Sequence, residues 1–161
     1  MRGILLQREV QVLADDYSED LIQRINLVLQ DVIFELAGSF KSGEIPRQPQ
    51  NHSKATYYPK RTPADGLIDF SASTDSVYGL IRAAGRPYPG AFSFCDGQKL
   101  IIWRAEPGLA SKAEPGRILS VQEHGRLLIA TGDGAIWATE VEMDGVERPR
   151  EFLCVGKQLG S

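Results

Sequence analysis

A proline-rich and aromatic stretch, residues 55–70, places the strongest constraint on how this chain can fold. Pro59 and Pro63 disfavour helical geometry at the residues before them, and Asp65-Gly66 is a dipeptide typical of turns. The stretch is therefore expected to run as an extended strap between a strand-and-helix part and a part made mostly of β-strands. Either of two roles fits it: an anchored interdomain linker, or the wall of an anion-binding groove carrying Tyr57, Tyr58, Lys60 and Arg61.

The part before the strap is predicted to form one strand and one long helix. Residues 4–12 open apolar and then alternate, which indicates a strand. Ser18 is the expected N-cap of a helix that ends near Gly38 and Gly43. The helix carries one apolar stripe, which should pack on a sheet: Leu21, Ile25, Val28, Leu29, Val32 and Leu36, widened by Ile22, Ile33 and Phe40.

The part after the strap is predicted to form one short helix and a small closed barrel. Ser73 should cap the helix, and Gly85 should end it. Turns at Asp96-Gly97, His124-Gly125, residues 132–134 and Asp144-Gly145 then separate short strands, which suit an oligonucleotide/oligosaccharide-binding (OB) barrel or an SH3-like barrel. The expected strands are residues 91–95, 99–105, 117–123, 126–131 and 135–141.

Composition excludes several classes of protein. The 161 residues are 42% hydrophobic with a net charge of −3, so a core can form and no global field attracts nucleic acid or an anionic membrane. No apolar run approaches the ~20 residues of a membrane helix, and charged side chains interrupt residues 1–8 too early for these residues to be expected as a secretory signal. Cys95 and Cys154 have neither metal-ligand spacing nor a disulfide framework, so a reduced, cytoplasmic setting is expected.

No set of residues with catalytic or metal-binding spacing emerges from the chain. His52 and His124 are expected in a linker and a turn, and residues 132–134 fit a hairpin rather than a phosphate loop, because no helix follows them. Arg82 lies on the short helix. Tyr88, between two prolines, suits a packed corner and a ligand-facing position equally.

The strap and the segment after the short helix together resemble a known family. Residues 56–63 (Thr-Tyr-Tyr-Pro-Lys-Arg-Thr-Pro), Asp65, residues 68–70 and residues 86–92 (Arg-Pro-Tyr-Pro-Gly-Ala-Phe) are similar to the C-terminal half of formyl-tetrahydrofolate-dependent formyltransferases. This family includes the methionyl-tRNA and amino-sugar formyltransferases, and the strap is most similar to members that act on UDP-amino-arabinose and related small amines.

The resemblance implies an organisation in three parts. Residues 1–43 would be the last strand and helix of a Rossmann-like α/β domain, residues 44–72 an interdomain linker or strap, and residues 73–161 a short helix with an OB-like barrel. The fold class is therefore expected to be α+β.

The resemblance also implies a reaction, the transfer of a formyl group from formyl-tetrahydrofolate to the amine of a small acceptor such as a nucleotide-linked amino sugar. Of the family's catalytic Asn, His and Asp, the first two would lie upstream, and Met1 falls where the Asp is expected. This chain alone is therefore expected to be inactive and to bind no cofactor. Contacts to the acceptor would come from Lys60, Arg61, Arg82 and Tyr88.

Two alternatives stay open at this point. A tRNA-binding module is disfavoured because residues 73–161 carry no basic excess. A non-enzymatic remnant is the other alternative. Since the helix stripe would lack its sheet, it should be covered by a second copy, by the barrel or by the α/β domain.

Overall fold

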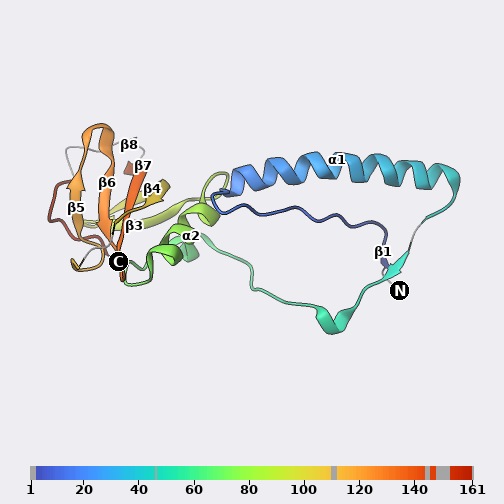
Figure 1. The fold of residues 1–161 in the computed structure, drawn as a ribbon, viewed down its shortest axis with the longest axis horizontal. Coiled ribbons are helices and arrows are strands. Elements are labelled where there is room, and N and C mark those ends of the chain that lie inside the picture. The colour runs from blue at the N-terminus through green and yellow to red at the C-terminus, as the bar shows by residue number, and fades with distance from the viewer. Residues whose placement is uncertain (1–2, 46, 110–111, 144–145, 148–152, 161) are drawn as a thin grey trace. The chain divides into compact units, whose positions relative to one another are not determined.

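The computed structural model describes residues 3–160 except for 46, 110–111, 144–145 and 148–152. The chain divides into two compact units, Met1–Lys60 and Arg61–Ser161 (Figure 1). Helices and strands both occur, and the strands pair antiparallel, so the α+β class is confirmed. No helix in the described part of the chain is long and apolar enough to cross a membrane.

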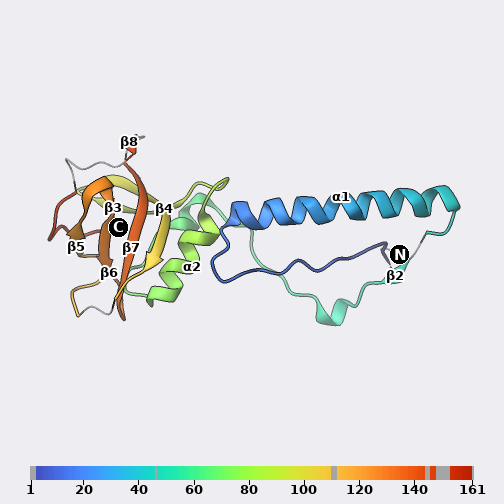
Figure 2. The ribbon, with the colours of Figure 1, turned by 45° about the horizontal axis from the view of Figure 1, so that its top comes forward.

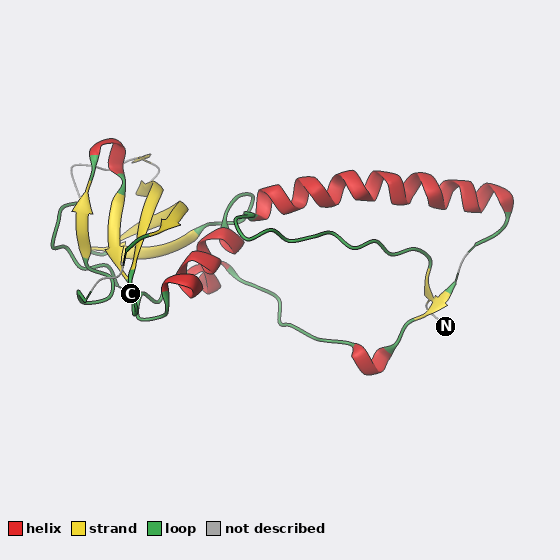
Figure 3. Cartoon of the chain, in the orientation of Figure 1, coloured by secondary structure: helices red, strands yellow, loops and turns green. Residues whose placement is uncertain are grey.

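The first unit is dominated by one helix, α1 (Ser18–Ser42), which Figure 3 shows as its main regular element. Strand β1 (Gly3–Ile4) pairs antiparallel with β2 (Gln48–Pro49), and a short 3-10 helix, η1 (His52–Lys54), follows. The expected strand over residues 4–12 is wrong beyond its first residue. A strand needs a partner, and β2 offers only two residues for pairing.

The ends of α1 follow from local chemistry. The N-cap is Tyr17 rather than Ser18, because the Asp20 carboxylate folds back and accepts a hydrogen bond from the Tyr17 backbone N–H at 3.0 Å. Gly43 ends the helix in the left-handed region at φ 77°, as expected for a C-terminal glycine, whereas Gly38 lies inside the helix. None of the 25 helical residues is buried.

The second unit packs one helix against an antiparallel sheet (Figure 2). A 3-10 turn, η2 (Pro63–Gly66), leads to α2 (Thr74–Ala84), which Ser73 caps as predicted. The sheet has the order β3-β4-β7-β6-β5, with β8 paired to β7 and a 3-10 turn, η3 (Glu123–Gly125), between β5 and β6. The strands are β3 (Ala91–Cys95), β4 (Gln98–Pro107), β5 (Ile118–Val121), β6 (Leu127–Ala130), β7 (Ala135–Met143) and β8 (Val146–Glu147).

Sequence patterning explains these strands well. Asp96 and Gly97 both adopt positive φ, 51° and 80°, which gives the twist that suits a two-residue hairpin between β3 and β4. The inward faces of the strands supply the core with Val77 and Ile81 of α2. Its largest fully buried side chains in the sheet are those of Leu100, Ile102, Ile118, Leu127, Ile129, Ile136 and Val141. The predicted turn at Asp144-Gly145 lies outside the described residues.

The expectation of a closed barrel is not met: the sheet is open. Its two edge strands, β3 and β5, do not pair with each other. Instead the C-terminal segment, residues 156–160, makes one isolated β-bridge near each edge of the sheet. Gly160 pairs with Phe94 of β3, and Gln158 pairs with Arg117, the residue just before β5. A run of single bridges satisfies some edge N–H and C=O groups without adding a strand.

The turn at residues 132–134 is a hairpin turn, as predicted, and it also holds α2 in place. The Asp133 carboxylate accepts hydrogen bonds from the Thr74 backbone N–H at 2.7 Å and from its hydroxyl at 2.9 Å. The Gly132 N–H donates to the Ala72 carbonyl at 2.9 Å. The turn therefore satisfies a donor at the N-terminus of α2 from outside the helix.

We expect this cap to make stability depend on pH in the acid range. The hydrogen bonds from the Thr74 backbone N–H, and then from its hydroxyl, lower the pKa of Asp133. A carboxyl whose pKa is lower in the folded state stabilises the fold above the unfolded value of about 3.9, and this contribution is lost as pH falls through the folded value. Asp133→Asn should therefore be less stable than wild type at neutral pH, with the gap closing below about pH 4.

The measurement is urea unfolding followed by tryptophan fluorescence from pH 7 to pH 2. Glu114→Gln, which removes an exposed carboxylate in the same unit, is the control. A gap between Asp133→Asn and wild type that stayed constant across this range would contradict the assignment of the cap.

Candidate functional site

A turn between α2 and β3, residues 85–90, forms the centre of the candidate site and is called here the Gly90 corner. It closes on the end of α2 through hydrogen bonds from the Gly90 N–H to the Ala84 carbonyl at 2.9 Å and from the Tyr88 N–H to the Gly85 carbonyl at 3.0 Å. Gly90 has φ 86°, and a Cβ there would lie 2.4 Å from the Ile101 side chain. Only glycine therefore lets the corner lie this close to β4.

The end of the strap packs on the Gly90 corner. Thr62 and Asp65 form a capping box around η2, and the hydrogen bonds from the Thr62 backbone N–H and then its hydroxyl lower the pKa of Asp65. A Cβ at Gly66 would lie 2.7 Å from the Gly90 carbonyl oxygen. Beyond this contact, the Ile68 N–H donates to the Phe92 carbonyl at 2.8 Å. The strap from residue 62 onward is thus fixed to the second unit.

A group of charged and aromatic side chains lies beside the corner on β4 and β7. The Arg86 guanidinium stacks 4.4 Å from the centre of the Trp103 ring and binds Glu140 at 2.6 Å. Arg104 approaches the other oxygen of Glu140 at 3.8 Å. The Trp103 indole N–H donates to Glu142 at 2.9 Å. These contacts fix the Trp103 ring and the guanidinium groups of Arg86 and Arg104 at the surface of the second unit.

Three of the four predicted acceptor-binding residues belong to this region. Arg61 is exposed and immediately precedes the anchored part of the strap, and Tyr88 in the corner is 52% exposed. Arg82 lies two residues before Ala84 and stacks 4.8 Å from the centre of the Tyr78 ring. Lys60 is exposed and belongs to the first unit. Tyr88 is thus a solvent-facing residue rather than a packed one.

Sequence reasoning missed Trp103, Glu140 and Glu142 as members of the site. Their partners come from other strands or from the corner, because the β4–β7 register sets Ile101 opposite Glu142 and Arg104 opposite Glu140. The one available signal was the indole N–H of Trp103, which normally finds an acceptor when partly buried.

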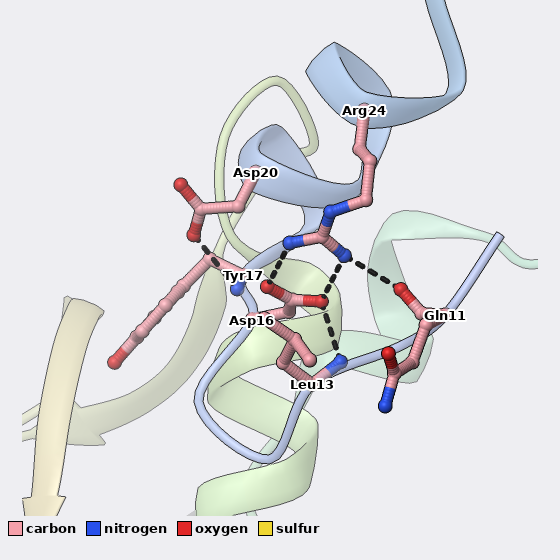
Figure 4. Close-up of polar contacts among 6 residues, drawn as sticks. All are labelled: Gln11, Leu13, Asp16, Tyr17, Asp20 and Arg24. Carbon is pink, nitrogen blue, oxygen red and sulfur yellow. Dashed lines mark hydrogen bonds and ion pairs between the residues drawn. The ribbon is translucent and has the colours of Figure 1, made fainter. Parts of the chain in front are cut away.

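A polar cluster of the first unit is drawn in Figure 4. The Arg24 guanidinium binds both oxygens of Asp16, at 2.6 and 2.8 Å, and donates to the Gln11 carbonyl at 2.6 Å. Asp16 also accepts from the Leu13 N–H at 2.7 Å, and hydrogen bonding to Asp16 raises the pKa of Arg24. The Arg24 guanidinium and the Asp16 carboxylate both contact backbone groups of the segment before α1, so the cluster holds that segment in place and is a structural contact.

The described part of the chain offers no metal-binding cluster, and burial disfavours chemistry at the Cys95 thiol. It holds no group of three or more His, Cys, Asp or Glu side chains that could hold a metal ion. Cys95 is buried, and burial raises the pKa of its thiol, which makes it less reactive. His52 and His124 are both exposed in 3-10 turns.

A family model described as "Formyl transferase, C-terminal domain" matches residues 60–153, which is more than half of the chain. The match begins at Lys60 and so contains the anchored strap, the Gly90 corner and the sheet.

Solved structures of HypX from Aquifex aeolicus share the fold. One variant of HypX superposes with a TM-score of 0.70 at 21% sequence identity, covering 86% of this chain and 25% of that chain. HypX in complex with tetrahydrofolic acid gives a TM-score of 0.57 at 25% identity, covering 71% of this chain and 20% of that chain. This chain therefore spans about a quarter of the length of the HypX chains it matches.

Proposed function

Because the chain belongs to the formyl transferase C-terminal domain family, we propose that it is the acceptor-side part of an enzyme that moves a formyl group from formyl-tetrahydrofolate to an amine. The amine acceptor is a small molecule, such as a nucleotide-linked amino sugar. In this role the Gly90 corner and the strap bind the acceptor's anionic group, and Lys60, Arg61, Arg82 and Tyr88 supply the contacts.

The charge of the Gly90 corner is the observation that favours a small anionic acceptor. The guanidinium groups of Arg86 and Arg104 lie beside it, and Arg61 and Arg82 are close to it along the chain. The carboxylates of this region are those of Asp65, Glu140 and Glu142. With Lys60, these residues have a net excess of two positive charges. This suits one compact anion, such as a diphosphate, whereas tRNA binding requires many phosphates to be neutralised. The tRNA-binding alternative is therefore the weaker one.

The exposed phenol of Tyr88 adds a second element. An aromatic face beside guanidinium groups can stack on a nucleobase or a sugar while the cations hold the phosphates. The same surface does not fit the folate, because a pterin needs an enclosed, mostly apolar pocket and residues 86–89 are exposed. The folate would be bound outside this region, and no step involving it is assigned to these residues.

We also propose that this chain alone does not catalyse the transfer. The reaction needs a group that takes the proton from the amine and donors that stabilise the tetrahedral oxyanion. Among the residues that the structure describes, no carboxylate accepts a hydrogen bond from His52 or His124 that would orient either ring as a base. Residues 1–43 are proposed to be only the end of a Rossmann-like domain. The groups that catalyse the transfer would then come from the rest of that domain.

Binding is tested by titrating the chain with UDP and with UDP-4-amino-arabinose and following tryptophan fluorescence and heat. We expect saturable binding that Arg61→Ala, Arg82→Ala and Tyr88→Ala each weaken about tenfold, the value of one good contact to a charged group. Arg117→Ala is the matched control, because Arg117 is exposed and its backbone makes the contact with Gln158. Equal effects of all four variants, or tighter binding of tRNA than of UDP at 150 mM salt, would contradict the proposal.

Turnover is tested separately with formyl-tetrahydrofolate and a panel of UDP-amino sugars. We expect no formylated product above the uncatalysed background from the 161-residue chain. Product formed in proportion to chain concentration would show that these residues do carry catalytic groups and would refute this part of the proposal.

A further inference from the structure

Helix α1 carries a second apolar face, separate from the apolar stripe that the sequence predicts. Leu27 and Phe34 are 65% and 80% exposed. They are seven residues apart and thus share one face, which lies about 100° or more around the helix from Ile33. Arg24 and Glu35, which bind the segment before the helix, lie on a different side again.

We propose that this second face is a docking surface for the same face of a second copy of the chain, with the two α1 helices antiparallel. The second face is defined as Gln23, Leu27, Gln30, Phe34, Gly38 and Lys41, with Glu19 and Asp20 at its N-terminal end. The inference does not rest on the proposed enzymatic role.

The second face is complementary to itself. A two-fold axis through an antiparallel helix pair makes residue i of one copy meet residue j of the other, and j meet i. The pairs Leu27–Phe34, Gln23–Gly38 and Asp20–Lys41 are each centred on the same point, between Gln30 and Asp31. A single two-fold axis therefore brings apolar side chains together, sets a polar side chain against a glycine, and sets an acidic side chain against a basic one.

The charges at the two ends of α1 favour the antiparallel pair. Glu19 and Asp20 lie in the first turn and Lys41 in the last turn of α1. Within one helix they are about 32 Å apart, too far to interact. In an antiparallel pair each end meets its opposite, and the helix dipoles are also antiparallel, which is favourable. A parallel pair would set Lys41 against Lys41 and the acids against the acids.

The sizes of the side chains on the second face also suit this pair. Phe34 offers the largest apolar surface on the face, and such large exposed aromatics are uncommon unless they are covered. Gly38 has nothing within 4 Å of the position of its Cβ. In the pair it leaves room for Gln23 of the partner copy, so the helices can approach along their whole length.

The self-association is tested by sedimentation equilibrium from 1 to 200 μM. The wild-type chain should show a reversible dimer at twice the monomer mass of 17.7 kDa. Phe34→Ser should raise the dissociation constant more than tenfold, and Ile33→Ser less than threefold. Ile33 is the matched control because it is the neighbouring residue, is 57% exposed, and lies on the other apolar face.

Charge exchange and cysteine trapping determine the orientation. Lys41→Glu should weaken the dimer by setting two acids against each other at the Asp20–Lys41 pair. Adding Glu19→Lys, which is next to Asp20, should recover part of the loss, since the two ends of α1 meet only between copies. In a Cys154→Ser background, separately tagged Q23C and G38C chains that are mixed and oxidised should form the mixed disulfide in preference to either homodimer. A monomer at 200 μM, a stronger effect of Ile33→Ser than of Phe34→Ser, or homodisulfides alone would overturn the proposal.

Discussion

Replacing Gly132 with alanine is expected to destabilise the second unit by about 3 kcal/mol, among the larger effects of a single methyl group. A Cβ at this position would lie 2.1 Å from the Ser71 carbonyl oxygen and 2.9 Å from that of Ala72. Both obstacles are backbone atoms, so no side-chain rotation can relieve the clash. The backbone would have to separate, which would also pull Asp133 away from the N-terminus of α2.

The expected result is a fall in melting temperature of about 12 °C or more, since 1 kcal/mol corresponds to 4–8 °C in a unit of this size. Tryptophan fluorescence is a suitable signal because Trp103 and Trp137 both belong to the second unit. Gly79→Ala is the matched control: it lies in α2 with nothing within 4 Å of its Cβ position, and it should stabilise by about 0.5–1 kcal/mol. A Gly132→Ala protein that melts within 3 °C of wild type would contradict the close packing of the turn on residues 71–72.

Truncating Leu100 to alanine should cost about 3 kcal/mol or more. Leu100 is fully buried in β4, where it pairs with Ser93 of β3 and Met143 of β7. Removing a buried leucine side chain loses its transfer free energy and leaves a cavity that the surrounding strands only partly fill.

Leu109→Ala is the control for this substitution, with the same change in the same unit at a side chain that is 89% exposed. It should alter the free energy of unfolding by less than about 0.5 kcal/mol. Urea unfolding of both variants, with similar m-values, is the measurement. Equal effects of the two substitutions would mean that β4 does not lie at the centre of the core.

Features that depend on neighbouring residues could be predicted from the sequence. The bounds of β3 are those expected, since the Asp96-Gly97 turn fixes the hairpin register. Helix α1 ends at Gly43 as expected, and its start differs by one residue because Asp20, rather than Ser18, supplies the capping bond. Local chemistry decides these ends.

Features that depend on distant partners could not be predicted in the same way. Alternation over residues 4–12 does not reveal that only Gly3 and Ile4 have a partner strand. The number of strands likewise does not decide whether β3 and β5 pair, and the sheet stays open.

The candidate site shows the same division. Arg61, Arg82 and Tyr88 were found through the strap and the proline-rich turn, which are local motifs. Trp103 and its acceptor Glu142 meet across 39 residues through the β4–β7 register, which a single sequence does not specify. The resemblance to formyltransferases indicated the family, whereas the arrangement of charges around the Gly90 corner required the fold.

The central claim is that the corner, with the strap end, binds the compact anionic group of a formyl acceptor. The most direct test is an amide NMR titration of the isotope-labelled chain with UDP-4-amino-arabinose. We predict saturable shifts confined to residues 61–66, residues 82–90 and Trp103, including its indole N–H. Saturable shifts in another part of the chain, or no shifts at millimolar ligand, would contradict the claim.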